Sequence, residues 1–489
     1  MSETIRGLSR RRKLIILASC CLSLLIVSMD MTIVNVAIPS IRTAFGASAA
    51  HLQWVIDIYT LVLASLLLLS GAAGDRWGRR RVFQAGLLIF AAGSLLCSLA
   101  PSIEWLIAAR FVQAVGGSML NPVAMSIITQ VFTGKVERAR AIGIWGAVVG
   151  ISMALGPIVG GALIQYVNWR SVFWINLPIC ALAIVLTAVF VPESKSSRRR
   201  DMDPIGQLLG MATLFALVYV LIEAPSKGWA NPGTVAVLAV AALAFIAFLA
   251  YESRRHDPFI DLRFFRSIPF ASATVIAVCT FAAYGAFLFM MSLYLQGYRG
   301  YSAMHTGLLY LPLAVGALIF SPLSGRLVGR FGGRPSLIAA GVLVTSATIM
   351  MSFMTAATPV WQLIAIFAVF GVGFSMVNAP ITTAAVSGMP LDRAGAASAV
   401  ASTSRQVGVS LGVALCGSIA AGAISVPGAD FAAQARPLWL VCAGLGLVVL
   451  ALGIFSTSRR AIASAERLAP LIAGAAPGTG RLHVAEPAR

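Results

Sequence analysis

Long apolar runs separated by short loops constrain this chain more than any other feature of its sequence. The runs recur from about residue 14 to residue 456, and each has the roughly 20 residues that an α-helix needs to cross a bilayer. Charged residues make up only 11% of the chain, whereas soluble domains carry about 25%. These features argue against a soluble multidomain enzyme and predict an all-α polytopic membrane protein.

The apolar runs predict 14 membrane spans. We place them at about 14–39, 50–70, 82–100, 104–130, 141–166, 172–191, 204–223, 232–251, 270–292, 304–323, 336–355, 360–381, 398–425 and 437–456. An even number of spans puts both termini on one side of the membrane. The first run continues to Pro39 without a small-residue cleavage site, so we expect an uncleaved first helix rather than a signal peptide.

The distribution of positive charge predicts the orientation. Of the 36 Lys and Arg residues, 29 lie in the termini and in every second loop, on one side of the predicted topology. Five lie on the other side, namely Arg42, Arg170, Lys227, Arg299 and Arg436. Cytoplasmic loops carry the excess of Lys and Arg, so we expect both termini in the cytoplasm. The basic loops therefore need no nucleic-acid partner.

The chain also repeats itself. The segment from Gly71 to Arg80 matches the segment from Gly325 to Arg334 at an offset of 254 residues. The repeat predicts two six-helix halves around a central cavity, as in transporters that alternate between two open states. The expected division is a tail 1–13, a first bundle 14–191, a linker 192–269 with two inserted spans, a second bundle 270–457 and a tail 458–489.

No sequence pattern predicts a metal, a cofactor or a disulfide. The seven cysteines fall inside apolar runs, as expected for packing: Cys20, Cys21, Cys97, Cys180, Cys279, Cys416 and Cys442. No phosphate-binding loop of the G-x-x-x-x-G-K-[ST] type occurs, which argues against an ATP-driven pump. We expect a transporter rather than an enzyme, with a monomer as the favoured state.

Five motifs occur in order along the first half. They run from Met29 to Pro39, Gly71 to Arg81, Arg110 to Gly117, Gly146 to Gly161 and Asn168 to Pro178. Together they resemble the major facilitator superfamily and, within it, the fourteen-helix drug:proton antiporter family. The resemblance covers nearly the whole chain and implies export of small molecules against an inward flow of protons.

The fourth motif is a glycine-rich helix that the resemblance associates with antiporters. Its candidate residues are Gly146, Gly150, Gly156, Pro157, Gly160 and Gly161. Small residues at helical spacing let another helix approach closely, and Pro157 removes a backbone donor. The pattern fits simple tight packing as well as a specific role in antiport, and both interpretations stay open.

The second motif is a basic loop between two spans. Its candidate residues are Gly71, Asp75, Arg76, Gly78, Arg79 and Arg80. Arginines in a short loop first of all fix topology. The resemblance adds that ion pairs of Asp75 with the arginines hold one state of the transporter closed.

Charges within membrane spans are costly and indicate function. The chain has Asp30, Asp57 and Arg110 at similar depth, roughly 9 to 14 Å below the predicted outer surface. No histidine lies at mid-span. We expect proton coupling at these three residues: one acid pairs with Arg110 and the other stays free, with Asp30 favoured as the proton carrier. A salt bridge that only fixes helix packing is the alternative.

Polar and aromatic residues on the same helices are candidates for the cavity. They are Ser23, Gln113, Asn121, Glu223, Tyr284 and Met291. Aromatic and Met side chains suit bulky apolar ligands, although ordinary packing explains any one of them. Glu223 also fits an interfacial position with its carboxylate in water.

The sequence therefore predicts a proton-driven antiporter in a bacterial cytoplasmic membrane that exports amphipathic small molecules such as drugs, antibiotics and dyes. An exporter of one endogenous metabolite or lipid would share every motif. A proton-coupled importer and a non-transporting membrane receptor are weaker alternatives.

Overall fold

The computed structural model describes residues 9–195, 203–255, 261–387, 394–425 and 431–472. Within these ranges all regular elements are helices, and no strand occurs. They are α2 (Arg10–Phe45), α3 (Ala49–Trp77), α4 (Arg79–Ser98), α5 (Ile103–Val131), α6 (Lys135–Tyr166), α7 (Ser171–Trp174), α8 (Asn176–Phe190), α9 (Pro204–Lys227), α10 (Pro232–Arg254), η1 (Leu262–Arg266), α11 (Ile268–Ser292), η2 (Leu293–Tyr298), α12 (Ala303–Leu309), α13 (Leu311–Phe331), α14 (Arg334–Met351), α15 (Val360–Ser375), α16 (Asn378–Val386), α17 (Ala394–Ser425), α18 (Phe431–Phe455) and α19 (Arg459–Ile472).

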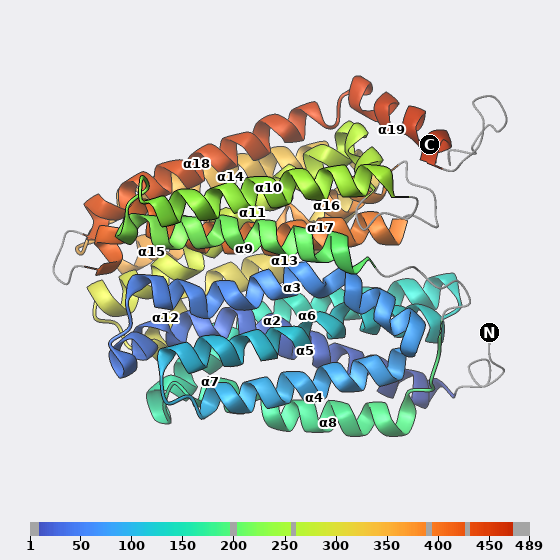
Figure 1. The fold of residues 1–489 in the computed structure, drawn as a ribbon, viewed down its shortest axis with the longest axis horizontal. Helices are drawn as coiled ribbons and strands as arrows, with labels where there is room; N and C mark the ends of the chain where they lie inside the picture. The colour runs from blue at the N-terminus through green and yellow to red at the C-terminus, as the bar shows by residue number, and fades with distance from the viewer. Residues whose placement is uncertain (1–8, 196–202, 256–260, 388–393, 426–430, 473–489) are drawn as a thin grey trace.

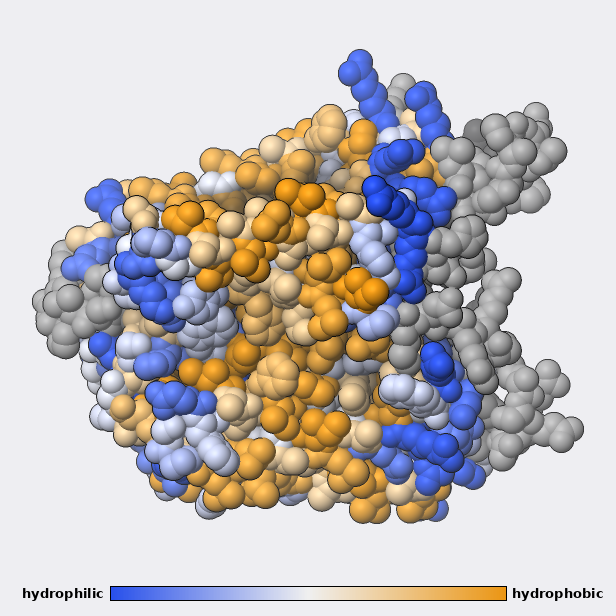
Figure 2. Space-filling model, in the orientation of Figure 1, coloured by the Kyte–Doolittle hydropathy of each residue, from blue (hydrophilic) through white to orange (hydrophobic). Residues whose placement is uncertain are grey.

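Thirteen helices of the described chain are long and apolar enough to cross a membrane. Figure 2 shows the apolar band that they form between two hydrophilic ends. The helix over the expected span 398–425 is α17, which is kinked at Ala420 and is not among the thirteen. The prediction of a polytopic all-α membrane protein is thus confirmed, with thirteen spans rather than fourteen supported by length and hydropathy.

Proline interrupts two of the expected spans. The span at 304–323 consists of α12 and α13, and Pro312 stands in the first turn of α13. The span at 360–381 consists of α15 and α16, and Pro380 follows the start of α16 at Asn378. Proline lacks the backbone N–H that would bond to the carbonyl oxygen four residues earlier, so the helical hydrogen bonding of each span is interrupted just before α13 and α16.

The helices form two bundles that lie side by side in Figure 1. In the N-terminal bundle α2 packs on α6, α3 on α5, and α4 on α5 and α8. The C-terminal bundle repeats these pairs as α11 with α17, α13 with α15, and α14 with α15 and α18. The same pairings therefore recur in both bundles, as the internal sequence repeat predicts. The linker helices α9 and α10 pack on each other, and α9 also contacts α3 and α17.

The two ends of the molecule differ in charge. One end carries the start of α2 and the arginines that follow α3 and α13, and we call it the basic end. The other end carries residues 46–48 and 299–302, and we call it the distal end.

A candidate site for protons and substrate

Asp30 of α2 and Arg110 of α5 form a buried ion pair inside the N-terminal bundle. Gln113 donates from Nε2 to Asp30 Oδ1 at 2.8 Å and accepts a hydrogen bond from Arg110 Nη1 at 2.7 Å. Arg110 Nε also donates to the carbonyl oxygen of Val55 at 3.1 Å. The carboxylate of Asp30 is thus both paired and hydrogen-bonded, which compensates its removal from water.

Asp57 of α3 lies apart from this network, where α3 packs on α17 of the other bundle. Its side chain is fully buried, and neither carboxylate oxygen has a hydrogen-bond partner among the described residues. Ser410 of α17 interacts with it, but the two groups do not meet the geometry of a hydrogen bond. An ionised carboxylate in these surroundings is costly, and protonation removes that cost.

Helix geometry explains why the three charges do not form one cluster. Residues two apart on an α-helix differ in direction by about 200°. The Tyr59 ring lies 4.1 Å from the guanidinium carbon of Arg110, so Asp57, two residues before Tyr59, points to the opposite side of α3, towards α17. The three charges share a depth but not a face, and the structure leaves Asp57 as the unpaired acid.

Gln53, one turn from Asp57, joins the two bundles directly. Its side-chain amide donates to the carbonyl oxygen of Val413 and, at 3.3 Å, to that of Ala414. Gly417 makes this approach possible, because a Cβ at that position would lie 2.2 Å from Gln53 Oε1. A polar side chain and a glycine therefore hold α3 tightly against α17 near the distal end.

A second close contact between the bundles lies between α6 and α12. A Cβ on Gly161 would lie 2.5 Å from the carbonyl oxygen of Ala303, and one on Gly307 would lie 2.2 Å from that of Pro157. Nearby, Gln296 donates to the carbonyl oxygen of Val36 at 2.9 Å. Together with the α3–α17 contact, these interactions bring the bundles together at the distal end.

The remaining candidates of the glycine-rich helix divide between two neighbours. Gly156 and Gly160 pack on α2, against Thr32 and Ile33, and Gly150 faces Leu318 of α13. The surroundings of Gly146 lie outside the described part of the chain. Close packing is thus present along α6, and part of it joins the bundles.

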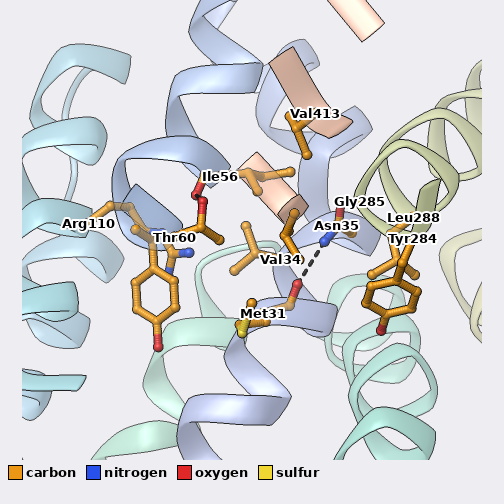
Figure 3. Close-up of a pocket in the computed structure, with 12 residues that line it drawn as sticks. Met31, Val34, Asn35, Ile56, Thr60, Arg110, Tyr284, Gly285, Leu288 and Val413 are labelled. Carbon is orange, nitrogen blue, oxygen red and sulfur yellow. Dashed lines mark hydrogen bonds between the residues drawn. The ribbon is translucent and has the colours of Figure 1, made fainter. Parts of the chain in front are cut away.

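A small pocket lies between the bundles at mid-depth. It is lined by Met31, Val34, Asn35, Ile56, Tyr59, Thr60, Arg110, Tyr284, Gly285, Leu288, Val409 and Val413. Figure 3 shows Arg110 and Tyr284 on opposite sides of this inter-bundle pocket, with Met31 and Val34 of α2 between them. Most of its lining residues are apolar, and Asn35, Thr60 and Arg110 are polar groups among them.

Of the predicted cavity residues, Tyr284 lines this pocket. Ser23 is buried and donates to the carbonyl oxygen of Cys20 in its own helix. Met291 is fully buried in the core, and Gln113 belongs to the Asp30 network. Asn121 is partly buried, and its Oδ1 atom has no hydrogen-bond partner among the described residues.

Glu223 lies at the distal end, between α9 and α3. It pairs with Lys227 at 3.1 Å and accepts a hydrogen bond from Trp54 Nε1 at 3.3 Å. The hydrogen bond with Trp54 joins the linker helix α9 to α3 of the N-terminal bundle, whereas the pair with Lys227 lies within α9.

The basic loop after α3 makes its contacts within the N-terminal bundle. Asp75 pairs with Arg79 at 2.7 Å. Arg80 donates from its backbone N–H to Glu193 Oε1 at 3.2 Å and from Nη2 to the carbonyl oxygen of Ala188. Among the other residues of this motif, Gly71 packs near Pro122. Gly78 has a φ of +114°, and the side chain of Arg76 is exposed.

Four polar residues of this region were not singled out as sites by the sequence: Gln53, Asn176, Arg405 and Ser410. Asn176 donates to Asp30 at 3.5 Å, and the buried hydroxyl of Ser410 lies near Asp57 without a hydrogen-bond partner among the described residues. Gln53, Asn176 and Ser410 are uncharged polar residues within or beside apolar runs, and that signal, followed along every run, would have found them.

Comparison with known proteins identifies the family. The Major Facilitator Superfamily model matches residues 20–413. The chain is 37% identical over 417 residues to the multidrug resistance protein Stp of Mycobacterium tuberculosis, covering 85% of this chain and 77% of that protein. It is 35% identical over 409 residues to the tetracenomycin C resistance and export protein of Streptomyces glaucescens, covering 82% and 74%.

A solved structure has the same fold. A bacterial homologue of the human lysosomal transporter Spinster, in an inward-facing and occupied conformation, superposes with a TM-score of 0.62 at 18% identity, covering 95% of this chain and 98% of that one. The family model, the relatives and the paired bundles agree: this chain is a polytopic membrane transporter that belongs to the Major Facilitator Superfamily.

Proposed function

We propose that this chain is a proton-driven antiporter that exports amphipathic small molecules, such as drugs, antibiotics and dyes, across a bacterial cytoplasmic membrane. The names of its relatives, which include a multidrug resistance protein and an antibiotic resistance and export protein, support export. The apolar inter-bundle pocket supports an amphipathic substrate. Proton coupling is supported above all by Asp57. This buried acid has no hydrogen-bond partner among the described residues and lies where α3 of one bundle packs on α17 of the other.

The position of Asp57 suggests how a proton and the transport cycle are linked. With the bundles together at the distal end, neutral Asp57 is tolerated in its buried position, whereas the ionised form is destabilised. Loss of the proton towards the basic end therefore favours separation of α3 from α17. Separation exposes Asp57 at the distal end, where it takes up the next proton and allows the contact to form again.

In this proposal the Asp30–Arg110 pair has a different part. It holds α2 against α5 and places Arg110 beside the inter-bundle pocket. Its charge stays compensated while Asp57 gains and loses a proton. The order in which the sequence ranked the two acids, with Asp30 first, is therefore reversed.

Asp57→Asn tests the coupling. In everted vesicles, adding ethidium should collapse an imposed pH gradient with the parent protein and not with Asp57→Asn, which mimics the protonated acid. Asp30→Asn is the matched control, and its molecules in the membrane should keep proton movement. If Asp30→Asn loses it and Asp57→Asn keeps it, the proton carrier is Asp30. If both keep it, coupling through a carboxylate is wrong.

We also infer a fourteen-span topology with both termini in the cytoplasm, in which α17 is the remaining span and the basic end is cytoplasmic. The length of α17, 32 residues, and the unequal distribution of positive charge support it. Cysteine introduced at Thr133, exposed at the basic end, should react with an impermeant maleimide in everted vesicles but not in intact cells. Cysteine at Ala230 should react in the opposite way, and a reversed result contradicts the orientation.

A further inference from the structure

Arg405 is a positive charge within the membrane part of the C-terminal bundle. It lies on α17 about 16 Å from the start of that helix. The sequence has no carboxylate between Asp261 and Asp392, and only Asp430 between there and Glu466. In the described part of the chain, no acid forms an ion pair with Arg405. Intramembrane arginines usually find a counter-charge or a carbonyl, or face water.

The contacts of Arg405 orient its guanidinium group without neutralising it. Nη2 donates to Thr382 Oγ1 at 2.7 Å and to the carbonyl oxygen of Asn378 at 3.5 Å, both on α16. The guanidinium carbon lies 6.0 Å from the centre of the Phe281 ring. Nε is buried and has no hydrogen-bond partner among the described residues. The group is held in place through Nη2, and its Nε donor is unused.

The next residue, Gln406, also has an unused polar atom. Its Oε1 is buried without a hydrogen bond in the described chain, and Nε2 makes only a 4.0 Å contact with the Met31 sulfur of the other bundle. Unpaired buried polar atoms are uncommon in folded proteins. Arg405 and Gln406 are adjacent, and each has a buried polar atom without a hydrogen bond in the described chain. Such a pair, close to the other bundle, indicates a place where a polar ligand binds.

Arg405 continues the wall of the inter-bundle pocket. Residues 405, 409 and 413 are spaced by four and share one face of α17, and Val409 and Val413 line the pocket. Val413 is labelled at the top of Figure 3. Arg405 therefore lies one helical turn from the pocket, on its basic-end side.

Three aromatic rings form a chain of contacts from the pocket to Arg405. Tyr284, which lines the pocket, stacks on Phe374 with ring centres 4.2 Å apart. Phe374 contacts Phe281 edge to face at 5.0 Å, and Phe281 is the ring beside Arg405. An apolar surface thus leads from the pocket to a fixed cation.

We propose that Arg405 binds a carboxylate carried by the transported molecule, while Phe281, Tyr284 and Phe374 contact its aromatic body. Arginine presents N–H groups in a planar fork that matches a carboxylate, and Nε is free for it. The proposal rests on the proposed export function and adds a substrate class, amphipathic organic anions with an aromatic part.

Two fluorescent probes of nearly equal shape test the charge preference. The purified protein in nanodiscs is titrated with 9-anthracenecarboxylate and with the neutral 9-anthracenecarboxamide. The parent protein should bind the carboxylate at least about tenfold more tightly, because a charge-assisted hydrogen bond is lost with the amide. Equal affinities in the parent protein overturn the proposal without any variant.

Variants then assign the preference to Arg405. R405Q should lose the preference, with the amide affinity changed less than about twofold, and R405K should keep part of it because the charge remains. R436Q is the matched control: this arginine also lies over a ring, Phe353 at 5.2 Å, but outside the site, and the preference should persist. If R405Q retains the preference, or if its affinities for the carboxylate and the amide fall by the same factor, Arg405 is not the anion site.

The outcome is separable from that of the export proposal. Ethidium export with proton movement, but no preference for the carboxylate probe, leaves the export function intact and overturns the anion site. A carboxylate preference that R405Q removes, in a protein that exports neither ethidium nor the anthracene probes, supports the anion site and overturns the export function.

Discussion

Asp30 and Asp57 are both fully buried acids, and the difference between their surroundings separates the two regions of this transporter. Asp30 lies in the interior of one bundle and is held by Arg110, Gln113 and Asn176. Asp57 lies where the two bundles meet, without a hydrogen bond among the described residues. A satisfied charge suits a region that moves as one body, whereas an unsatisfied one suits a contact that forms and breaks.

The two intramembrane arginines repeat this contrast. Arg110 has an acid, a backbone carbonyl and the Tyr59 ring, 4.1 Å from its guanidinium carbon. Arg405 has neutral partners and an unused Nε. In each pair of like charges, the residue inside the N-terminal bundle is compensated, whereas Asp57 on α3 and Arg405 on α17 have no counter-ion among the described residues.

The largest effect is expected from removing Arg110, because Asp30 would then be a buried charge without its counter-ion. Removing one member of a buried pair typically destabilises by about 3–5 kcal/mol. Arg110→Gln should therefore abolish accumulation of folded protein, measured as abundance in the membrane and as the thermal midpoint in detergent.

The double variant Asp30→Asn with Arg110→Gln removes both charges and should restore much of the abundance. Equal losses in the single and double variants would mean that Arg110 acts through Val55 and Tyr59 rather than through the ion pair. Abundance near the parent level in Arg110→Gln would refute the structural role.

An intermediate effect is expected at Gln53, which joins the bundles. Gln53→Ala removes a hydrogen bond worth about 1 kcal/mol, which corresponds to roughly a fivefold change in an equilibrium. Cys416 on α17 is buried and close enough to Asp57 to interact with it, so it reports on this contact. In a background without the other cysteines, its rate of maleimide labelling should rise about fivefold.

Gln165 supplies the control for this measurement. It is exposed near the end of α6, and Gln165→Ala should leave the labelling of Cys416 unchanged. An unaltered rate in Gln53→Ala would show that the hydrogen bond contributes nothing to closure of the α3–α17 contact.

The smallest effect is expected from Asp75, whose pair with Arg79 is only partly buried, with side chains 28% and 12% exposed. Such pairs contribute up to about 1 kcal/mol. If the basic loop acts on the equilibrium between states, Asp75→Asn should keep normal abundance while ethidium export slows by about two- to fivefold. Reduced abundance with full activity per molecule would favour a role in topology alone.

Much of the fold follows from sequence because it depends on local and repeating properties. Apolar length predicts the spans, and the match between Gly71–Arg80 and Gly325–Arg334 predicts two similar bundles, whose helix pairings recur in the structure. The breaks before Leu311 and Asn378 also have a local cause in Pro312 and Pro380. The irregular segment of α17 at Ala420 has no comparable signal.

The candidate site was predictable in its residue types and depth but not in its pairing. Depth follows from counting residues along a helix, and it predicts similar levels for Asp30, Asp57 and Arg110. Direction follows from helical periodicity, which already puts Tyr59 and Asp57 on opposite sides of the same helix. Neither depth nor direction specifies which helix packs against each face.

The sequence by itself thus determined a membrane transporter of paired bundles, with its few buried charges and their depth, because bilayer thickness and helical rise act on each segment separately. Only the tertiary structure decided that Arg110 belongs to Asp30, that Asp57 faces α17, and that Arg405 lies beside the Phe281 ring. Those relations join residues that are 80 or more positions apart, and they depend on how whole helices pack, which no local pattern specifies.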